Sequence, residues 1–402
     1  MIAIGFPLIY RQGAGLLAGI GDLVRPFGCK PYIVADAFVQ RTYGAAVRAS
    51  LQAAGLEPVF DDFRGECAPR AIAAAAARAR EGRHDCIIGL GGGKAIDTAK
   101  AVKIETGLPI IVVPTIASND SPTSRLAITY AEDGSFIGPR FMKANPEAVF
   151  VDTEVIARAP VRYFCAGIAD ALATRFEAEQ VVAAGKPNFF DARPTEAAIC
   201  LAEHCYHLIR TYGPQAVADV AVQRASIAVE KVTEANILLS GLGFEGCGVA
   251  GAHAIGMALS VLPDAKGILH GEEVAIGLLA QLWLEGRDAA FMEDMLDFYG
   301  RVRLPRCLAE LGLTDIGDAD LRRVATYAAR EGSRLHNMNR SVTAEDVAQA
   351  LGFVAALDRT YPGPRRFPGP RHRTQDPSSA PPSAASPVGA ELQRAQTGGN
   401  RE

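Results

Sequence analysis

The stretch that decides the fold is Asp85-Cys-Ile-Ile-Gly-Leu-Gly-Gly-Gly-Lys-Ala-Ile-Asp97. Residues 86–90 are a short apolar run, which is typical of a buried strand. Residues 95–103 carry apolar side chains at helical spacing, and glycines at positions 91–93 join the two segments. We therefore predict a strand, a glycine turn and a helix in direct succession.

The glycine turn has two interpretations at this point. Without side chains, backbone amides can approach a diphosphate closely, and the N-terminus of the following helix adds partial positive charge. The same glycines also suit a tight strand-to-helix connection that needs positive φ angles. The spacing is not G-x-G-x-x-G, so the usual dinucleotide fingerprint does not decide between them.

Composition limits the class of protein. A chain of 402 residues can hold two domains, and a formal charge of −4 gives no reason to expect a nucleic acid as partner. There is no basic segment followed by an apolar run at the N-terminus and no apolar run long enough for a membrane span. The eight cysteines include no C-x-x-C pair, which favours a reducing cytoplasm over a disulfide framework.

Outward from the glycine turn, apolar runs alternate with helical patterns. Strands are predicted at residues 2–10, 31–36, 58–60, 86–90 and 109–113, with helices near residues 13–24, 39–54, 68–81 and 95–103. This alternation predicts a doubly wound parallel sheet that is covered on both faces and binds ligands at the carboxyl ends of its strands. Residues 126–130 and 148–151 are predicted to form a small antiparallel addition around a turn at residues 133–134.

From about residue 160 only helical apolar spacing is found. Helices are predicted at residues 161–182, 195–212, 215–240, 246–261, 272–284, 291–299, 318–330 and 343–357. We therefore predict an α/β domain at residues 1–158 and an all-helical domain at residues 159–360. Residues 361–402 are rich in Pro, Ser and Arg and poor in large apolar side chains, which predicts a disordered tail.

Asp36 closes the predicted strand at residues 31–36. A carboxylate at that place can accept hydrogen bonds from both hydroxyls of an adenosine ribose and repels a 2′-phosphate, which favours NAD over NADP. The alternative is an N-cap or turn aspartate. Both interpretations stay open on the sequence alone.

Three polar residues in the helical half are surrounded by small apolar neighbours: Asp170, His253 and His270. A buried carboxylate or imidazole without a partner is costly or shifts its pKa until it is neutral. Three such residues on separate helices are explained if they converge on one divalent cation, and two imidazoles with one carboxylate leave a coordination position open for catalysis. Each residue taken singly could instead be a hydrogen-bonded core residue.

A second set of ligand types lies on one predicted helix, where Cys200, His204 and His207 have i, i+4 and i+7 spacing. One helix cannot surround a metal ion. We therefore interpret Cys200 as a packing residue and the two histidines as partly exposed.

The sequence resembles the glycerol dehydrogenases within the metal-dependent (iron- or zinc-containing) alcohol dehydrogenases. The most specific stretches are Pro114-Thr-Ile-Ala-Ser-Asn-Asp120 and Ser240-Gly-Leu-Gly-Phe-Glu245. The resemblance extends from the N-terminus to about residue 360. The matching stretches are residues 33–36, 89–100, 114–124, 145–153, 159–178, 240–254, 270–275 and 336–338.

The resemblance implies a dehydroquinate synthase-like or glycerol dehydrogenase-like fold with the active site between its two halves. It places the zinc ligands, with Fe²⁺ as the alternative metal, on Asp170, His253 and His270, and a substrate-contacting aspartate on Asp120. It implies a homo-oligomer, typically an octamer, whereas the cytoplasmic location is predicted from the cysteine pattern. The implied NAD contacts are Asp36, Gly92, Gly93, Lys94, Thr115, Ser118, Ser124, Leu126 and Tyr130.

The implied reaction is reversible, NAD-dependent oxidation of a secondary hydroxyl of glycerol or a close 1,2-diol, with the metal lowering the pKa of that hydroxyl. The alternatives are a dehydroquinate-synthase-like cyclase, another polyol or hydroxy-acid dehydrogenase of the same fold, and a non-catalytic binding protein. A cyclase must grip a phosphate and a carboxylate, yet Lys266 is the nearest base in sequence to the predicted ligands. Arg125 stands where the family usually has a small residue, and we expect it to reach the nicotinamide side or an acidic substrate group.

Overall fold

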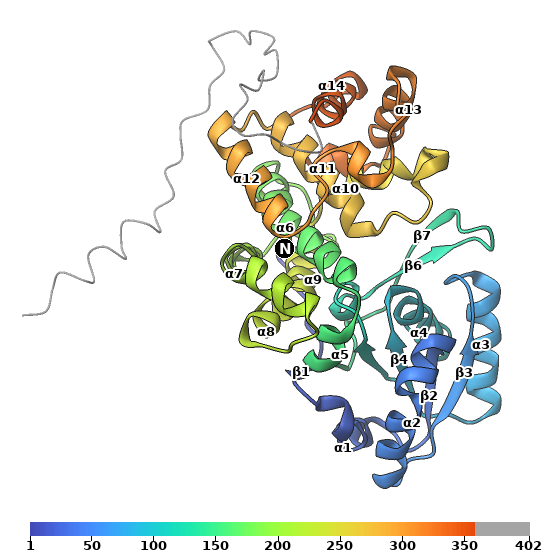
Figure 1. Cartoon of the computed structure of the whole chain (residues 1–402). Coiled ribbons are helices and arrows are strands. Elements are labelled where there is room, and N and C mark those ends of the chain that lie inside the picture. Colours follow the sequence, from blue (N-terminus) through green and yellow to red (C-terminus); the bar gives the residue numbers. More distant parts are fainter. Residues whose placement is uncertain (358–402) are drawn as a thin grey trace, which may run out of the picture. The chain divides into compact units, whose positions relative to one another are not determined.

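The sheet that carries the glycine turn has six strands, all parallel, in the order β1-β8-β5-β4-β2-β3. Its strands β1, β2, β3 and β4 are labelled in the lower half of Figure 1. The sheet is seen in a computed structural model that describes residues 1–357, apart from the side chain at position 62. The predicted tail at residues 361–402 lies outside the described residues. The strands are β1 (Ile9–Gly13), β2 (Pro31–Asp36), β3 (Val59–Phe63), β4 (Cys86–Gly91), β5 (Ile110–Pro114) and β8 (Ala148–Asp152).

Helices cover both faces of this sheet, so the prediction of a doubly wound parallel sheet is confirmed. Side chains alternate along each strand. On β2, Ile33 and Ala35 pack in one cluster with α1 and α2, whereas Tyr32 and Val34 pack in another with α3 and α4. The helices of this half are α1 (Ile20–Val24), α2 (Ala37–Ala53), α3 (Pro69–Glu81), α4 (Gly93–Thr106) and α5 (Thr153–Arg158).

The first strand begins later than predicted. β1 covers Ile9–Gly13, and the predicted strand at residues 2–10 is wrong for most of its length. The N-terminal segment instead contacts the helical half, where Ile2 forms an isolated bridge with Arg193. An ideal Cβ on Gly5 would lie 2.2 Å from Asn145 Oδ1 and 2.7 Å from the ring of Phe190, so a larger residue there would displace these side chains.

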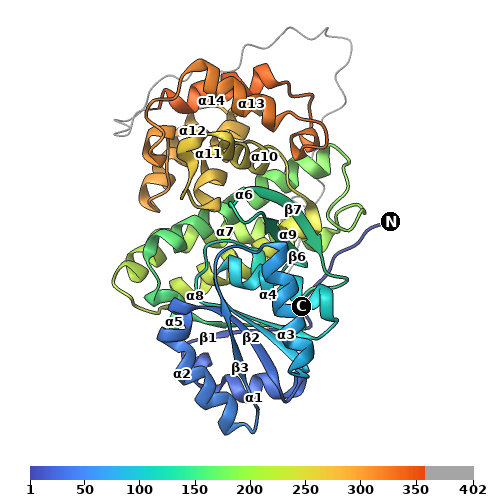
Figure 2. The same cartoon turned by 90° about the vertical axis from the view of Figure 1, so that its right-hand side faces the viewer.

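The small antiparallel sheet has a different partner from the one predicted. β6 (Leu126–Tyr130) pairs with β7 (Phe136–Phe141), and Figure 2 shows this hairpin beside α4. β8 is fully buried and pairs in the main sheet with β1 and β5. Gly138 and Pro139 lie inside β7, and because both residue types are disfavoured in strands, the sequence pattern did not predict β7.

After Asp152 every regular element of the described residues is helical, apart from the single bridge at Arg193. Three predicted helices have wrong bounds. α7 continues through Pro214, and the predicted helix at residues 215–240 is divided between α7, α8 and a π-helical segment. The predicted helix at residues 246–261 is interrupted at residues 248–250, between α9 and α10. The helices are α6 (Val161–Ala183), α7 (Glu196–Ala221), α8 (Ile227–Glu234), the π-helical segment Ala235–Leu239, α9 (Ser240–Cys247), α10 (Gly251–Ala258), α11 (His270–Leu284), α12 (Ala289–Arg301), α13 (Asp318–Ala328) and α14 (Ala344–Ala355).

The described residues belong to one compact unit, so the division at residues 158 and 159 stays a prediction. None of the described helices is by itself long and apolar enough to cross a membrane. Among the described residues, one pair of helical segments joined by a sharp bend, Ile227–Cys247 and Gly251–Val261, is long and apolar enough when the two segments are counted together.

Candidate active site and metal centre

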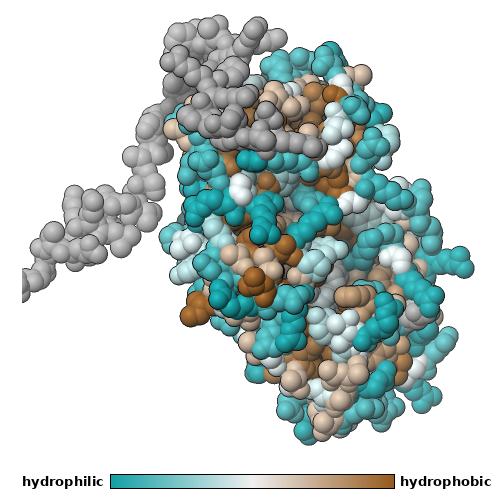
Figure 3. All heavy atoms as spheres, viewed as in Figure 1, coloured by the Kyte–Doolittle hydropathy of each residue, from teal (hydrophilic) through white to brown (hydrophobic). Residues whose placement is uncertain are grey.

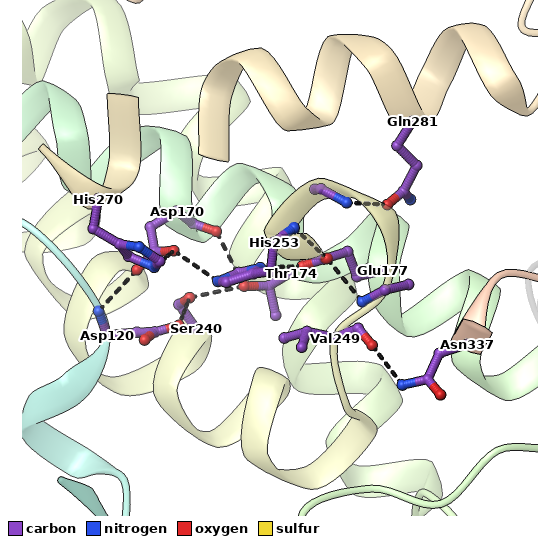
Figure 4. A network of polar contacts seen from close by, with 12 residues as sticks. Asp120, Asp170, Thr174, Glu177, Ser240, Val249, His253, His270, Gln281 and Asn337 are labelled. Carbon is purple, nitrogen blue, oxygen red and sulfur yellow. Dashed lines mark hydrogen bonds and ion pairs between the residues drawn. The ribbon is translucent and has the colours of Figure 1, made fainter. Parts of the chain in front are cut away.

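Three ligand groups from three helices converge in the helical half. Asp170 lies on α6, His253 on α10, and His270 is the first residue of α11 (Figure 4). One ligand atom from each side chain lies within 4.8 Å of the others. Asp170 Oδ1 is 3.3 Å from His253 Nε2 and 3.5 Å from His270 Nε2. The structure therefore brings the three predicted ligands together.

The surroundings of Asp170 suit a bound cation. The carboxylate is fully buried, and its Oδ1 accepts no hydrogen bond among the described residues. Burial raises the pKa of Asp170, but the charges of His270 and His253 outweigh this effect and leave the pKa below its usual value. A buried anionic oxygen without a hydrogen bond is costly. Two imidazole nitrogens and one carboxylate oxygen fit zinc or iron(II), so the donor set fits the group that the sequence implies.

His253 is oriented by Glu177, a residue that sequence reasoning missed. Glu177 Oε2 lies 2.5 Å from His253 Nδ1, and Oε1 accepts hydrogen bonds from the backbone N–H groups of Ala250 and His253. This leaves Nε2 to face Asp170. A signal was present: Glu177 follows Asp170 at i+7 on α6, so two acids lie on the same side of a buried helix.

Two further contacts fix the turn that carries His253. Gln281 Oε1 accepts a hydrogen bond of 2.7 Å from the backbone N–H of Ala252, and Asn337 Nδ2 donates one of 2.8 Å to the carbonyl of Val249 (Figure 4). Both side chains are buried. The imidazole is therefore held by its backbone as well as by Glu177.

The loop after β5 brings Asp120 to the three ligand groups. Its backbone N–H donates a hydrogen bond of 3.2 Å to Asp170 Oδ2, and its own Oδ2 accepts one of 2.8 Å from Ser240 Oγ. Burial and the nearby charge of Asp170 raise the pKa of Asp120 to about 8. The predicted substrate aspartate thus lies beside the predicted metal ligands.

The glycine turn lies at the carboxyl ends of two neighbouring strands. Gly91 ends β4 with φ 151°, and Gly92 is the N-cap of α4. Asp36 ends β2, and its Oδ1 accepts hydrogen bonds from the backbone N–H groups of Phe38 and Val39. An ideal Cβ on Gly91 would lie 3.8 Å from Asp36 Oδ2. Asp36 therefore caps α2 and also lies next to the glycine turn.

The other predicted cofactor contacts differ in their surroundings. Lys94, just after Gly93, forms an ion pair of 2.5 Å with Glu66, and the backbone N–H of Thr115 donates to the carbonyl of Gly91. Ser118, Leu126 and Tyr130 are half-buried. Ser124 is buried, and its hydroxyl contacts Ser121 and Lys100, so its side chain points into the protein.

Two buried charged residues on α4 were not predicted. Lys100 donates hydrogen bonds to the carbonyls of Ser121 and Leu126 as well as to Ser124 Oγ. Burial raises the pKa of Asp97 to about 6, against the opposing charge of Lys100. Asp97 follows Gly93 by four residues, so the two residues lie on the same side of α4.

Arg125 does not occupy the place that we expected. Its guanidinium lies 4.2 Å from the centre of the Phe190 ring and donates a hydrogen bond to the carbonyl of Phe189. Its Nε is 3.4 Å from Glu245 Oε1. Half-buried aromatic partners and the buried Glu245 therefore hold the side chain, and the expectation that it reaches the nicotinamide or the substrate is wrong.

Cys200, His204 and His207 form no ligand cluster in the described residues. The two imidazoles are exposed and stacked, with ring centres 6.3 Å apart. Cys200 is exposed as well, so its interpretation as a packing residue is wrong. A helix of this length shows only part of its circumference to the core, and α7 places this residue outside that part.

Comparisons with known proteins agree with this arrangement. Residues 7–153 match the profile of the family described as iron-containing alcohol dehydrogenase. Glycerol dehydrogenase from Thermotoga maritima is 40% identical over 86% of this chain and 94% of that protein. Glycolaldehyde reductase from Halobacterium salinarum is 41% identical over 86% of this chain and 94% of that protein. The crystal structure of glycerol dehydrogenase from Schizosaccharomyces pombe matches with a TM-score of 0.85 and 32% identity, covering 89% of this chain and 91% of that one.

Proposed function

We propose a substrate and a role for each site residue from one premise: the chain belongs to the iron-containing alcohol dehydrogenase family. It is an oxidoreductase, and its similarity to glycerol dehydrogenases over most of its length supports reversible polyol oxidation. The family is metal-dependent and binds NAD. The substrate we propose is glycerol or a close 1,2-diol, oxidised at its secondary hydroxyl.

One observation carries this proposal: Asp120 is hydrogen-bonded to Asp170, so the loop after β5 meets the cluster that contains His253 and His270. Ligands of parallel sheets bind where strands end, and the glycine turn follows β4, the neighbour of β5. A cofactor held at the turn and a diol held at the cluster would therefore share one edge of the sheet.

The three clustered side chains would hold the cation. When bound there, a divalent cation supplies Lewis-acid activation of a hydroxyl, and NAD takes up the two electrons. Asp170 contributes the negative charge, and Glu177 keeps Nε2 of His253 directed to the shared site. We propose zinc as the resident metal, with Fe²⁺ as the alternative.

Asp120 would orient the diol. Its Oδ2 is taken up by Ser240, so Oδ1 is the atom that would accept a hydrogen bond from a substrate hydroxyl. With a pKa raised to about 8, this carboxyl can also take up a proton near neutral pH.

The charges around the site favour an uncharged substrate over a hydroxy acid or a phosphorylated one. Asp97, Asp120 and Asp170 are acidic, and Glu273 lies one turn after His270 with its pKa raised by burial to about 7. The nearby cations are engaged elsewhere, as the contacts of Lys100 and Arg125 show. Lys100 and Arg125 are therefore not available to pair with an anionic substrate, which also disfavours the cyclase.

For the cofactor we propose NAD in preference to NADP. The carboxylate of Asp36 lies next to the glycine turn, where it would accept hydrogen bonds from ribose hydroxyls and repel a 2′-phosphate. The backbone around Gly92 and Gly93 would approach the diphosphate at the N-terminus of α4.

We also propose a homo-oligomer in the cytoplasm. Large apolar side chains are exposed, and apolar groups gather in the middle of the face in Figure 3. The eight cysteines are free thiols, which suits a reducing compartment. Light scattering checks the subunit number, and a monomer at working concentration would contradict the oligomer. The exposed apolar residues include Phe6, Leu8, Ile137, Val222 and Ile227.

The test is a substrate panel on protein stripped of metal and reloaded with Zn²⁺ or Fe²⁺. Steady NADH formation is expected with glycerol and 1,2-propanediol, and much less with lactate or glycerol 3-phosphate. NADP should support slower turnover than NAD. If the metal-reloaded protein forms no NADH with any diol in the panel, the proposed function is ruled out.

A further inference from the structure

We propose that Ser240 is a positioning residue that holds the carboxylate of Asp120 in place for the substrate. The inference rests on the proposed role of Asp120 and adds a residue to which no role in the reaction has been given. It starts from a chain of buried hydroxyls that links the β5 loop to the helix of the metal ligand Asp170 (Figure 4).

Ser240 Oγ makes two hydrogen bonds of 2.8 Å, one to Asp120 Oδ2 and one with Thr174 Oγ1. All three residues are buried, so water does not compete for these contacts. Ser240 Oγ donates its one proton to Asp120 Oδ2, so Thr174 Oγ1 is the donor in its contact with Ser240. Thr174 Oγ1 also lies 3.4 Å from the carbonyl oxygen of Asp170.

The backbone around Asp120 is anchored independently of Ser240. Thr123 Oγ1 donates to the carbonyl of Ile237, and Asn145 Nδ2 donates to the carbonyl of Thr123. Asn236 Nδ2 donates to the carbonyl of Ala117. The loop is therefore held on both sides of Asp120, whereas Ser240 acts on its side chain. Removing the hydroxyl should free the carboxylate and leave the loop in place.

The helix that carries Ser240 is shaped to reach this loop. Asn236 and Ile237 lie in the π-helical segment Ala235–Leu239, and Ser240 follows directly. Such segments widen a helix by one residue and are frequent at functional sites. At Gly241 an added Cβ would lie 1.9 Å from Thr123 Oγ1 and 2.8 Å from the carbonyl oxygen of Asp120. Only glycine permits the close approach that the Ser240 hydrogen bond needs.

The kinetic test compares Ser240→Ala with the parent enzyme and with Thr233→Val. Thr233 is buried in α8, and its hydroxyl has no hydrogen-bond partner among residues 1–357, so this control removes a buried hydroxyl that does not bond to Asp120. Ser240→Ala should lower kcat/KM for glycerol by about 10- to 100-fold, the range for one lost hydrogen bond to a charged group. The KM for NAD and the zinc content should stay at the parent values, and Ser240→Thr should restore part of the activity.

A double-mutant cycle shows whether Ser240 acts through Asp120. In the Asp120→Ala background, Ser240→Ala should cause no further loss. An equal loss in both backgrounds would mean a general structural role and would overturn the inference. So would parent activity in the single variant Ser240→Ala.

A crystal structure of Ser240→Ala separates this inference from the proposed function. The Asp120 carboxylate should rotate away from its present position while the backbone of residues 117–123 stays unchanged. An unmoved carboxylate would overturn the inference whatever substrate the enzyme uses. A parent enzyme that oxidises no diol, together with a rotated carboxylate, would contradict only the proposed function.

Discussion

At the scale of single residues, the two histidines of the cluster are held differently. The Nδ1 of His253 contacts the carboxylate of Glu177, and His253 is almost fully buried. The side chain of His270 is 36% exposed. The burial of His253 is tolerated because its Nδ1 pairs with Glu177 and its Nε2 lies 3.3 Å from Asp170 Oδ1. The charges of these two carboxylates raise the pKa of His253 well above the usual value although burial lowers it. A bound cation would replace the proton on the nitrogen that faces Asp170.

Replacing Glu177 with Gln should weaken metal binding by about 10- to 100-fold. The amide keeps the size of the side chain, but it removes the charge that fixes the tautomer of His253. Dissociation constants for Zn²⁺, measured by competition with a chelator, check this. Glu179→Gln is the matched control, because this half-exposed glutamate on the same helix pairs with Arg287. Unchanged zinc affinity in Glu177→Gln would show that the contact does not act on the metal.

Asp36 has a capping role and a proposed cofactor role, and substitution can separate them. Asn caps helices about as well as Asp, so Asp36→Asn should keep the stability of α2. The preference of this variant enzyme for NAD over NADP should fall. Asp36→Gly should relax the preference too and cost only a few tenths of a kcal/mol. Ratios of kcat/KM for the two cofactors provide the measurement. The N-cap variant Asp288→Asn on α12 is the control. A parent that uses both cofactors equally would contradict the proposed role.

At the scale of elements, the site depends on helices that approach the β5 loop very closely. A Cβ on Gly167 of α6 would lie 1.9 Å from the carbonyl oxygen of Ala117, and one on Gly241 of α9 would lie 2.8 Å from the carbonyl oxygen of Asp120. Backbone atoms cannot be displaced cheaply in a close-packed interior. The two glycines therefore set the distance between the loop and the helices that bear Asp170 and Ser240.

Gly241→Ala should lower both activity and stability, because the added methyl group pushes the loop away from α9. Overpacking of this kind typically costs about 1–3 kcal/mol. Gly352→Ala on α14 is the control: a Cβ there meets nothing within 4 Å, so the change should be neutral or stabilising by up to about 1 kcal/mol. Urea unfolding and kcat/KM are measured side by side. Parent-like behaviour of Gly241→Ala would contradict the close approach.

At the scale of the whole molecule, the site joins segments that are distant in sequence. Asp120 and Ser240 are 120 residues apart, and Glu177 and His253 are 76 residues apart. A cation that binds only where these segments meet stabilises the folded chain by linkage. Thermal unfolding should therefore occur at a lower temperature after the metal is removed.

A chain that ends at residue 360 should keep the turnover of the full chain. Every residue proposed for the site lies within the described residues, and the last described helix, α14, ends at Ala355. Glycerol oxidation and zinc content of the two chains are compared under the same conditions. Loss of turnover in the shorter chain, with its zinc retained, would show that residues 361–402 act in the reaction.

The sequence alone determined the features that follow from local patterns. Apolar runs and helical spacing located β2, β4, α6 and α14 to within a few residues, because burial follows from the period of the side chains. Acids and imidazoles among small apolar neighbours identified Asp170, His253 and His270 for the same reason: a buried polar group needs a partner. The resemblance to a known family supplied Asp120.

Only the tertiary structure decided which distant groups meet. In the structure β8 belongs to the main sheet, and Arg125 packs on the ring of Phe190. Glu177 contacts His253, and Ser240 donates a hydrogen bond to Asp120. A periodic pattern states that one side of an element is buried, but it does not name the element against which that side packs. Hydrogen bonds act over about 3 Å, so their partners depend on how all the elements pack together.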